Sequence, residues 1–461
     1  MTALALARSQ FAFTVAFHYI YPPLSIGLGL ILVIMEGLYL RTGNPLYHQM
    51  TRFWVRIFGL IFAVGVATGV VMEFEFGTNW ATYSRYVGDV FGSALASEGI
   101  FAFFLESGFL AILLFGWDKV SKRMHFLSTL LVAFGAHFSA VWITVANSWM
   151  QTPSGYHIVG EGLKARAEIT SFWAMVFSPS SMDRLLHVYA AAWATGAWLV
   201  ISVSSYYLLK KRHLDFAKAS LKVGLAVAFV SAVGNMITGD ISAKGVARNQ
   251  PEKLAAMEGV FEPNAPADEH LFGWVRAGEE RVRGVKAPIG GLLSWLVHGD
   301  RTAPVPGLKS FPADERPPVN VVFQAYHGMV AIGVFLFGLT LAGLFFLWRG
   351  TLAERRELLW VFVFAVLGPQ IANQLGWITA EVGRQPWIVY KLLRTSAALS
   401  KTVQAGAILG SLIMFALIYL LLFAVFIYLL DHKIRQGPEE EDLVLPVGPS
   451  GMSDLLKGHR A

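Results

Sequence analysis

The chain has 461 residues, of which 55% are hydrophobic and only 15% charged, and its mean hydropathy is +0.53. This composition excludes an ordinary soluble domain and predicts an integral membrane protein. The net charge of +6 lies mostly in short loops, so it indicates membrane orientation and argues against a nucleic-acid partner. The absence of cysteine excludes disulfides, thiolate zinc sites, iron–sulfur clusters and covalently attached haem.

We predict an all-α fold with nine transmembrane helices, because a span needs about 20 apolar residues and such runs recur along the chain. Residues 1–239 hold six spans, residues 240–323 form one long extramembrane loop, residues 324–430 hold three spans, and residues 431–461 form a tail. The predicted spans are Phe11–Leu38, Arg52–Glu73, Phe91–Phe115, His125–Met150, Arg184–Leu209, Ser220–Thr238, Gln324–Trp348, Leu358–Ala380 and Val403–Leu430.

Basic residues gather in alternate loops, for example at Lys119–Arg123 and Lys210–Arg212. Cytoplasmic loops are enriched in Lys and Arg, so we expect a periplasmic N-terminus, a cytoplasmic C-terminus and a periplasmic 240–323 loop in a bacterial inner membrane. The outer loop after span eight also carries basic residues, which suggests that they bind acidic groups there. Within the long loop, spacing alone predicts that Lys253 and Glu258 lie on a solvated helix face.

The stretch W-I-T-A-E-V-G-R-Q-P-W at Trp377–Trp387 places Glu381 and Arg384 at the end of span eight. A charged group near a membrane helix is costly, so a metal or an acidic cofactor would explain both residues. An interfacial ion pair that merely ends the helix explains them equally well.

Five possible iron ligands fall near the outer ends of five different spans. They are His18, Glu98, His187, Met329 and Glu381. A single membrane His is more often a packing residue, but five such side chains at one depth favour haem ligation in a chain without cysteine.

Glu98 and Glu106 lie about 12 Å apart along one face of span three. Ser107 and Ser139 add hydroxyl groups at a similar depth. Intramembrane carboxylates and hydroxyls are typical of proton relays. The alternative is a structural role in which these groups bond neighbouring helices.

Several motifs, in one order along nearly the whole chain, resemble subunit I of the cytochrome bd-type quinol oxidases of the short-loop class, which includes the cyanide-insensitive oxidases. They are E-F-x-F-G-T-N-W at Glu73–Trp80, E-G-x-x-A-F-F-L-E-S at Glu98–Ser107, V-A-N-x-W-M-Q at Val145–Gln151, K-L-A-A-M-E at Lys253–Glu258 and G-R-Q-P-W at Gly383–Trp387.

The resemblance implies a terminal oxidase that oxidises quinol at the periplasmic side and reduces O2 to water with cytoplasmic protons, generating a proton motive force without pumping. It implies His187 and Met329 as ligands of a low-spin haem b, and His18 and Glu381 as ligands of two high-spin haems, with Glu98 beside them. Trp377 would lie between the haems and Arg384 beside the cofactors. Lys253 and Glu258 would bind quinol in the long loop, called the Q-loop. Glu98, Glu106, Ser107 and Ser139 would carry protons.

The resemblance also implies partners: a second large membrane subunit (subunit II), single-helix accessory subunits, ubiquinol or menaquinol, and O2. The high-spin haems would be b and d, or b in place of d. Two other classes remain open from the residues alone. A quinol electron-transfer subunit would show no CO-induced spectral shift, and a transporter would contain no haem.

One position departs from the better-known relatives, which have Arg two residues before the ligand Met, where this chain has His327. Imidazole favours the reduced haem less than a fixed guanidinium does. We therefore predict a lower low-spin haem potential than in Arg-bearing relatives. A redox titration should show the potential rising in His327→Arg, and an unchanged value would contradict the prediction.

Overall fold

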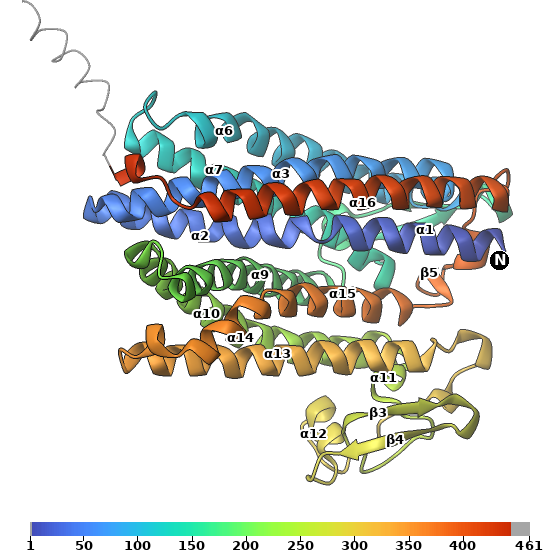
Figure 1. Ribbon diagram of the computed structural model, residues 1–461. Coiled ribbons are helices and arrows are strands. Elements are labelled where there is room, and N and C mark those ends of the chain that lie inside the picture. Colours follow the sequence, from blue (N-terminus) through green and yellow to red (C-terminus); the bar gives the residue numbers. More distant parts are fainter. Residues whose placement is uncertain (1, 444–461) are drawn as a thin grey trace, which may run out of the picture.

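The computed structural model describes residues 2–443, and within that range nine helical segments are long and apolar enough to cross a membrane. The long helices lie side by side in one bundle, and α1 begins at the opposite end from that at which α16 finishes (Figure 1). The predicted fold class is therefore confirmed. We call the end at which α1 begins the N-terminal end of the bundle.

The nine segments consist of the following helices. They are α1 (Ala3–His18) with α2 (Tyr21–Thr42), α3 (Pro45–Thr78), α5 (Gly88–Ser97) with the π-helical turn η1 (Glu98–Phe103) and α6 (Phe104–Phe115), α7 (Lys122–Gln151), α9 (Ser181–Lys210), α10 (Leu214–Asn249), α13 (Val319–Trp348), α14 (Arg356–Ala365) with α15 (Leu367–Val382), and α16 (Ala405–Gln436).

The first span breaks after His18, although the sequence predicted one continuous helix. Two prolines at the start of α2 lack the N–H groups that would continue the helical hydrogen bonds. The N–H of Ile20 bonds Phe17, and the carbonyl oxygen of Ala16 accepts from Nε2 of Gln374 on α15 at 2.7 Å. The break therefore ties α1 to α15 at the level of His18. The eighth span is likewise divided, at Val366 between α14 and α15.

Outside the spans, residues 2–443 form short helices and three two-stranded antiparallel sheets. The helices are α4 (Ala81–Tyr86), α8 (Phe172–Val176), α11 (Pro251–Glu258) and α12 (Leu292–His298). The strands are β1 (Tyr156–Val159) with β2 (Arg166–Ile169), β3 (His270–Arg276) with β4 (Arg281–Lys286), and β5 (Trp387–Val389) with β6 (Leu393–Arg394). The β3–β4 hairpin and α12 form a lobe beside α13 (Figure 1).

The long loop differs from its predicted form in two respects. Helix α10 continues to Asn249, so the predicted boundary at residues 239 and 240 falls inside a helix. Helix α11 is the helix predicted to carry Lys253 and Glu258, but the solvated face predicted for it is wrong. Lys253 is 4% exposed and Glu258 is 3% exposed, because α11 packs against α10 and α13.

The start of the predicted C-terminal tail packs against α3. The Asp442 carboxylate is fully buried and binds Arg52 at 2.9 Å and Arg56 at 2.5 Å. These residues of the predicted tail are therefore held against the bundle, because two guanidinium groups bind the carboxylate. The remainder of the tail, residues 444–461, lies outside the described residues.

Helices α2 and α9 cross at two glycines. A Cβ atom at Gly196 would lie 2.3 Å from the carbonyl carbon of Gly27, and one at Gly27 would lie 2.1 Å from the carbonyl oxygen of Ala192. Small residues at such crossings let the backbones approach closely, which is how membrane helices gain packing energy.

We predict that Gly196→Ala destabilises the bundle by more than about 2 kcal/mol, because its methyl group can be accommodated only by moving two backbones apart. Thermal unfolding in detergent measures the loss. Gly410→Ala on α16 is the matched control, because nothing lies within 4 Å of its added Cβ atom. Equal melting temperatures for the two variants would contradict the prediction.

Candidate functional site

Glu381, in the last turn of α15, is the centre of a buried polar network. Its Oε1 accepts from Nδ2 of Asn147 at 3.0 Å and from Nε2 of Gln151 at 3.3 Å, both on α7. Its Oε2 lies 2.5 Å from Nη2 of Arg384. The Glu381–Arg384 ion pair therefore exists, but Arg384 is only 3% exposed, so the pair is not a solvated helix end.

This network contains more positive than negative charge. Arg184, at the start of α9, donates to Oδ1 of Asn147 at 2.5 Å, and Lys253 reaches the same network through Gln151. Among the described residues, Nη1 of Arg384 is buried without a hydrogen-bond partner. An unpaired buried guanidinium nitrogen is costly. The arrangement is therefore suited to an anionic ligand.

Lys253 joins the extramembrane helix α11 to Glu381. Its Nζ donates to Oε1 of Gln151 and to Oε1 of Gln250, at 2.6 Å each. Burial, together with the nearby Arg184 and Arg384 charges, holds the pKa of Lys253 well below its usual value. Its stem packs on Gly383, where an added Cβ atom would lie 3.0 Å from the Lys253 Cγ.

His18 is held in one orientation by α3. Its Nδ1 lies 2.9 Å from Oγ1 of Thr68, and that hydroxyl donates to the carbonyl oxygen of Val64 in its own helix. The hydroxyl therefore accepts from Nδ1–H, which leaves the lone pair on Nε2. Gly69 follows Thr68, and a Cβ atom there would lie 3.2 Å from the His18 ring.

His187 repeats this arrangement on α9 and α10. Its Nδ1 lies 3.0 Å from Oγ1 of Thr238, which donates to the carbonyl oxygen of Gly234. Gly239 follows, with its hypothetical Cβ atom 3.5 Å from the His187 ring. Both histidines thus carry the proton on Nδ1 and present Nε2 for ligation, the tautomer that an iron ligand requires.

Met329 on α13 and Trp377 on α15 both lie at the turn of α15 that precedes Glu381. A Cβ atom at Gly376 would lie 2.9 Å from the Met329 sulfur, so this glycine makes room for the thioether. Trp377 stacks on Tyr19, with ring centroids 5.5 Å apart. Since Tyr19 follows His18, these contacts bring α1, α13 and α15 together.

The candidate ligands therefore lie in one region of the bundle. Trp377 and Glu381 are one helical turn apart on α15, and Arg184 and His187 are one turn apart on α9. Asn147 connects the two turns, because it binds both Arg184 and Glu381.

The carboxylates of the third span contact α7. Glu98, in the π-helical turn, accepts a short hydrogen bond from Ser139. Glu106 is 7% exposed and packs on Gly135, where an added Cβ atom would lie 3.0 Å from the Glu106 Cβ. The structure does not bring Ser107 to these groups, because its exposed hydroxyl donates to the carbonyl oxygen of Phe103 at 2.7 Å.

Glu258 belongs to a different network from Lys253. One oxygen of Glu258, one oxygen of Glu269 and one ring nitrogen of His327 lie within 4.8 Å of one another. Burial and the charge of Glu269 raise the pKa of Glu258 well above its usual value.

Sequence reasoning missed several residues that hold the site together. They are Thr68, Asn147, Gln151, Arg184, Thr238 and Glu269. Asn147 and Gln151 belong to the V-A-N-x-W-M-Q motif, and the dipeptide Thr-Gly recurs inside the second and sixth spans. The repeated dipeptide was the available signal for the two threonines.

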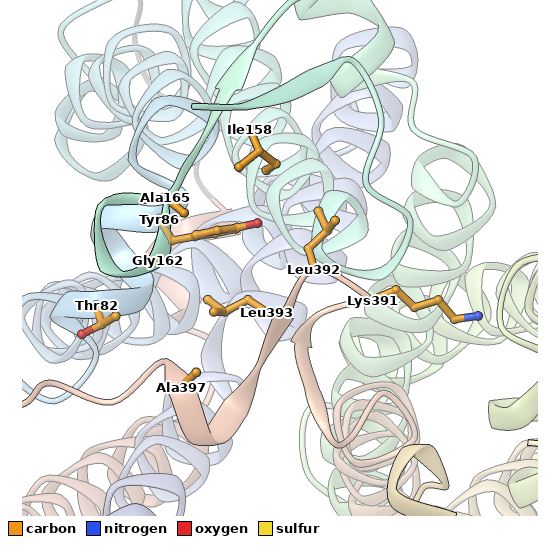
Figure 2. Close-up of a pocket in the computed structure, with 9 residues that line it drawn as sticks. All are labelled: Thr82, Tyr86, Ile158, Gly162, Ala165, Lys391, Leu392, Leu393 and Ala397. Carbon is orange, nitrogen blue, oxygen red and sulfur yellow. The ribbon is translucent and has the colours of Figure 1, made fainter. Parts of the chain in front are cut away.

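A surface pocket of about 320 Å³ lies elsewhere, between α4, the β1–β2 hairpin and the 391–397 loop (Figure 2). Its lining includes Tyr86 and Lys391 but none of the predicted site residues. This pocket is therefore separate from the Glu381 network.

Comparisons with known proteins all point to the same protein family. The sequence pattern of the cytochrome bd terminal oxidase subunit I family matches residues 6–438. Cytochrome bd ubiquinol oxidase subunit 1 of Bacillus subtilis (strain 168) is 38% identical, over 96% of each chain. Cytochrome bd-II ubiquinol oxidase subunit 1 of Escherichia coli (strain K12) is 36% identical, over 97% of this chain and 99% of the relative.

A solved structure, that of bd oxidase from Geobacillus thermodenitrificans, matches with a TM-score of 0.87 and 30% identity, over 95% of this chain and 99% of that one. Family membership implies haem cofactors, a quinol substrate and a complex of several subunits in a bacterial membrane. The chain belongs to the cytochrome bd terminal oxidase subunit I family, whose members are quinol:oxygen oxidoreductases.

Proposed function

We propose that this chain is the haem-bearing catalytic subunit of its oxidase, with quinol oxidised at the N-terminal end of the bundle. The observation that carries the proposal is the repeated His–Thr–Gly arrangement. Two histidines from different helices are each fixed by a threonine in the tautomer that leaves Nε2 free, with a glycine beside the ring. If His18 and His187 served only for packing, neither ring would need its tautomer fixed by a threonine or a glycine beside it.

The residues present fit haem groups. His187 and Met329 would hold a low-spin haem b, and His18 and Glu381 would hold two high-spin haems, which are b and d or both b. The unpaired Nη1 of Arg384 would bind a propionate. When bound, these haems would supply electron transfer from quinol and the reduction of O2 to water.

On the quinol side, Glu258 would accept a proton from the quinol hydroxyl. Burial and the charge of Glu269 raise the pKa of this carboxyl well above its usual value, which makes the carboxylate a stronger proton acceptor. Lys253 would fix the position of α11 relative to Glu381 and contribute to quinol binding through its Nζ. The protons released here would leave on this side of the membrane.

The protons consumed in forming water would travel through Glu106 towards Glu98 from the opposite end of the bundle. The buried Glu106 side chain and the Ser139–Glu98 hydrogen bond support this order. We leave Ser107 out of the route, because its hydroxyl bonds its own helix on an exposed face. Opposite proton exit and uptake would separate charge without a pump.

The basic loops support a periplasmic N-terminus and a cytoplasmic C-terminus. The proposed partners are a second large subunit, single-helix accessory subunits, and ubiquinol or menaquinol. The relatives in the comparisons include oxidases named for each quinol.

The decisive experiment uses the purified oxidase complex. Quinol should drive O2 uptake, and CO should shift the spectrum of the reduced haems. Glu106→Gln should lower quinol-driven O2 uptake by roughly a hundredfold, because it removes a proton carrier, while the haem spectrum is retained. Full turnover in this variant would overturn the proton route, and a complex without CO-reactive haem would overturn the catalytic assignment.

A second prediction concerns Thr238. The Nδ1–H hydrogen bond increases the basicity of a ligand histidine, which favours the oxidised iron. Thr238→Val should therefore raise the midpoint potential of the low-spin haem in a spectroelectrochemical titration. Thr340→Val is the matched control, because Thr340 makes the same helix-carbonyl bond at 2.8 Å and hydrogen-bonds no histidine of residues 2–443. Equal potentials in both variants would contradict the assignment of His187.

A further inference from the structure

The network around Glu258 contains two groups that the proposed function does not use. Glu269 immediately precedes β3, and its side chain is 14% exposed. One carboxyl oxygen of Glu258 and one of Glu269 lie within 4.8 Å of each other, so the two carboxyl groups are placed to hydrogen-bond one another. Such a bond requires a proton between them, because two carboxylates repel each other and neither can donate.

The pair is held in place from α13. His327 stacks on Phe323 with ring centroids 3.9 Å apart, and its Nε2 donates to the carbonyl oxygen of His270 at 2.7 Å. His270 follows Glu269, so this bond fixes the backbone that carries the second carboxyl. The same nitrogen lies 3.9 Å from Oε1 of Glu269.

Three such side chains could also suggest a metal site, but the geometry disfavours one. Both ring nitrogens of His327 contact backbone carbonyl oxygens. Nδ1 lies 3.0 Å from the carbonyl oxygen of Phe323, and Nε2 lies 2.7 Å from that of His270. Neither nitrogen is turned towards a metal ion. The remaining carboxyl oxygens, Oε2 of Glu258 and Oε2 of Glu269, are buried without partners among the described residues. They are sites at which a further proton can be accommodated.

We propose that Glu258 and Glu269 form a carboxyl pair that shares one proton and takes up a second from quinol, with His327 holding Glu269 in position. The proposal rests on quinol oxidation at this loop. Oxidation of one quinol releases two protons and two electrons, and the electrons pass ultimately to O2. The pair would accept one proton at a time at the free carboxylate and then release it to the aqueous side. Glu269 is thus a positioning residue that acts through Glu258.

The charge environment of the pair includes groups from each neighbouring element. They are Asp240 on α10, Tyr326 and His327 on α13, His270 on β3 and Lys286 on β4. Burial raises the pKa of Glu269 to about 7. Below that pKa the pair already holds two protons, so Glu258 can take none from quinol, and quinol oxidation should fall as the pH drops through about 7.

The test compares Glu269→Gln with the wild-type complex. Quinol-driven O2 uptake should fall by roughly ten- to hundredfold, and its decline near pH 7 should disappear. Uptake driven by tetramethylphenylenediamine, which gives electrons without protons, should be unchanged. Glu269→Asp should recover part of the activity and of the pH dependence, because it keeps a carboxyl group.

Glu262→Gln is the matched control, because Glu262 is an exposed carboxylate of the same loop paired with Lys309. Full quinol turnover with an unchanged pH profile in Glu269→Gln would overturn the carboxyl pair and leave the proposed function standing. Equal losses with both electron donors would also overturn it, since the defect would then lie outside proton acceptance. Failure of the wild-type complex itself to oxidise quinol would instead overturn the proposed function.

Discussion

The N-terminal end of the bundle depends on the contacts of the partly buried Glu381 carboxylate. Four elements supply its surroundings: α7, the start of α9, α11 through Lys253, and the loop after α15. Two guanidinium groups and the Lys253 amine surround one carboxylate there, and one guanidinium nitrogen has no partner among the described residues. Burying such an excess of positive charge is unfavourable unless another anion shares the site. The need for an acidic ligand thus follows from charge, independently of the iron ligands.

Helix α7 connects this centre to the carboxylates deeper in the bundle. Along its length, Gly135 contacts Glu106, Ser139 bonds Glu98, and Asn147 bonds Glu381. One rigid helix therefore fixes the relative positions of the groups proposed to carry protons and those proposed to hold cofactors. The glycine admits Glu106 close to the helix backbone, whereas the serine and asparagine supply short polar side chains that reach their partners without long flexible stems.

Hydrophobic run length predicted the nine spans that residues 2–443 contain, because the lipid core imposes a minimum apolar length on each one. The same signal could not predict the break after His18, which depends on two prolines and on Gln374 of a distant helix. Spacing predicted that Glu98 and Glu106 lie on one helix face, and both contact α7, but it could not show that Ser107 bonds its own helix on an exposed face. Glu269 could not be found at all, because its partner Glu258 is eleven residues away across an irregular loop and only the tertiary fold brings them together.

Helix α11 shows why the loop and the spans must be considered together. Its eight residues are too few to form a stable helix alone, and tertiary contacts must hold it. Lys253 and Glu258 are five positions apart, about 140° around a helix, so they point to different neighbours. Lys253 enters the Glu381 network, and Glu258 enters the pair with Glu269 beside α13. Helix α11 therefore contributes one side chain to each of two buried polar networks. Disrupting either network removes part of the tertiary contact that holds α11, and with it a residue of the other network.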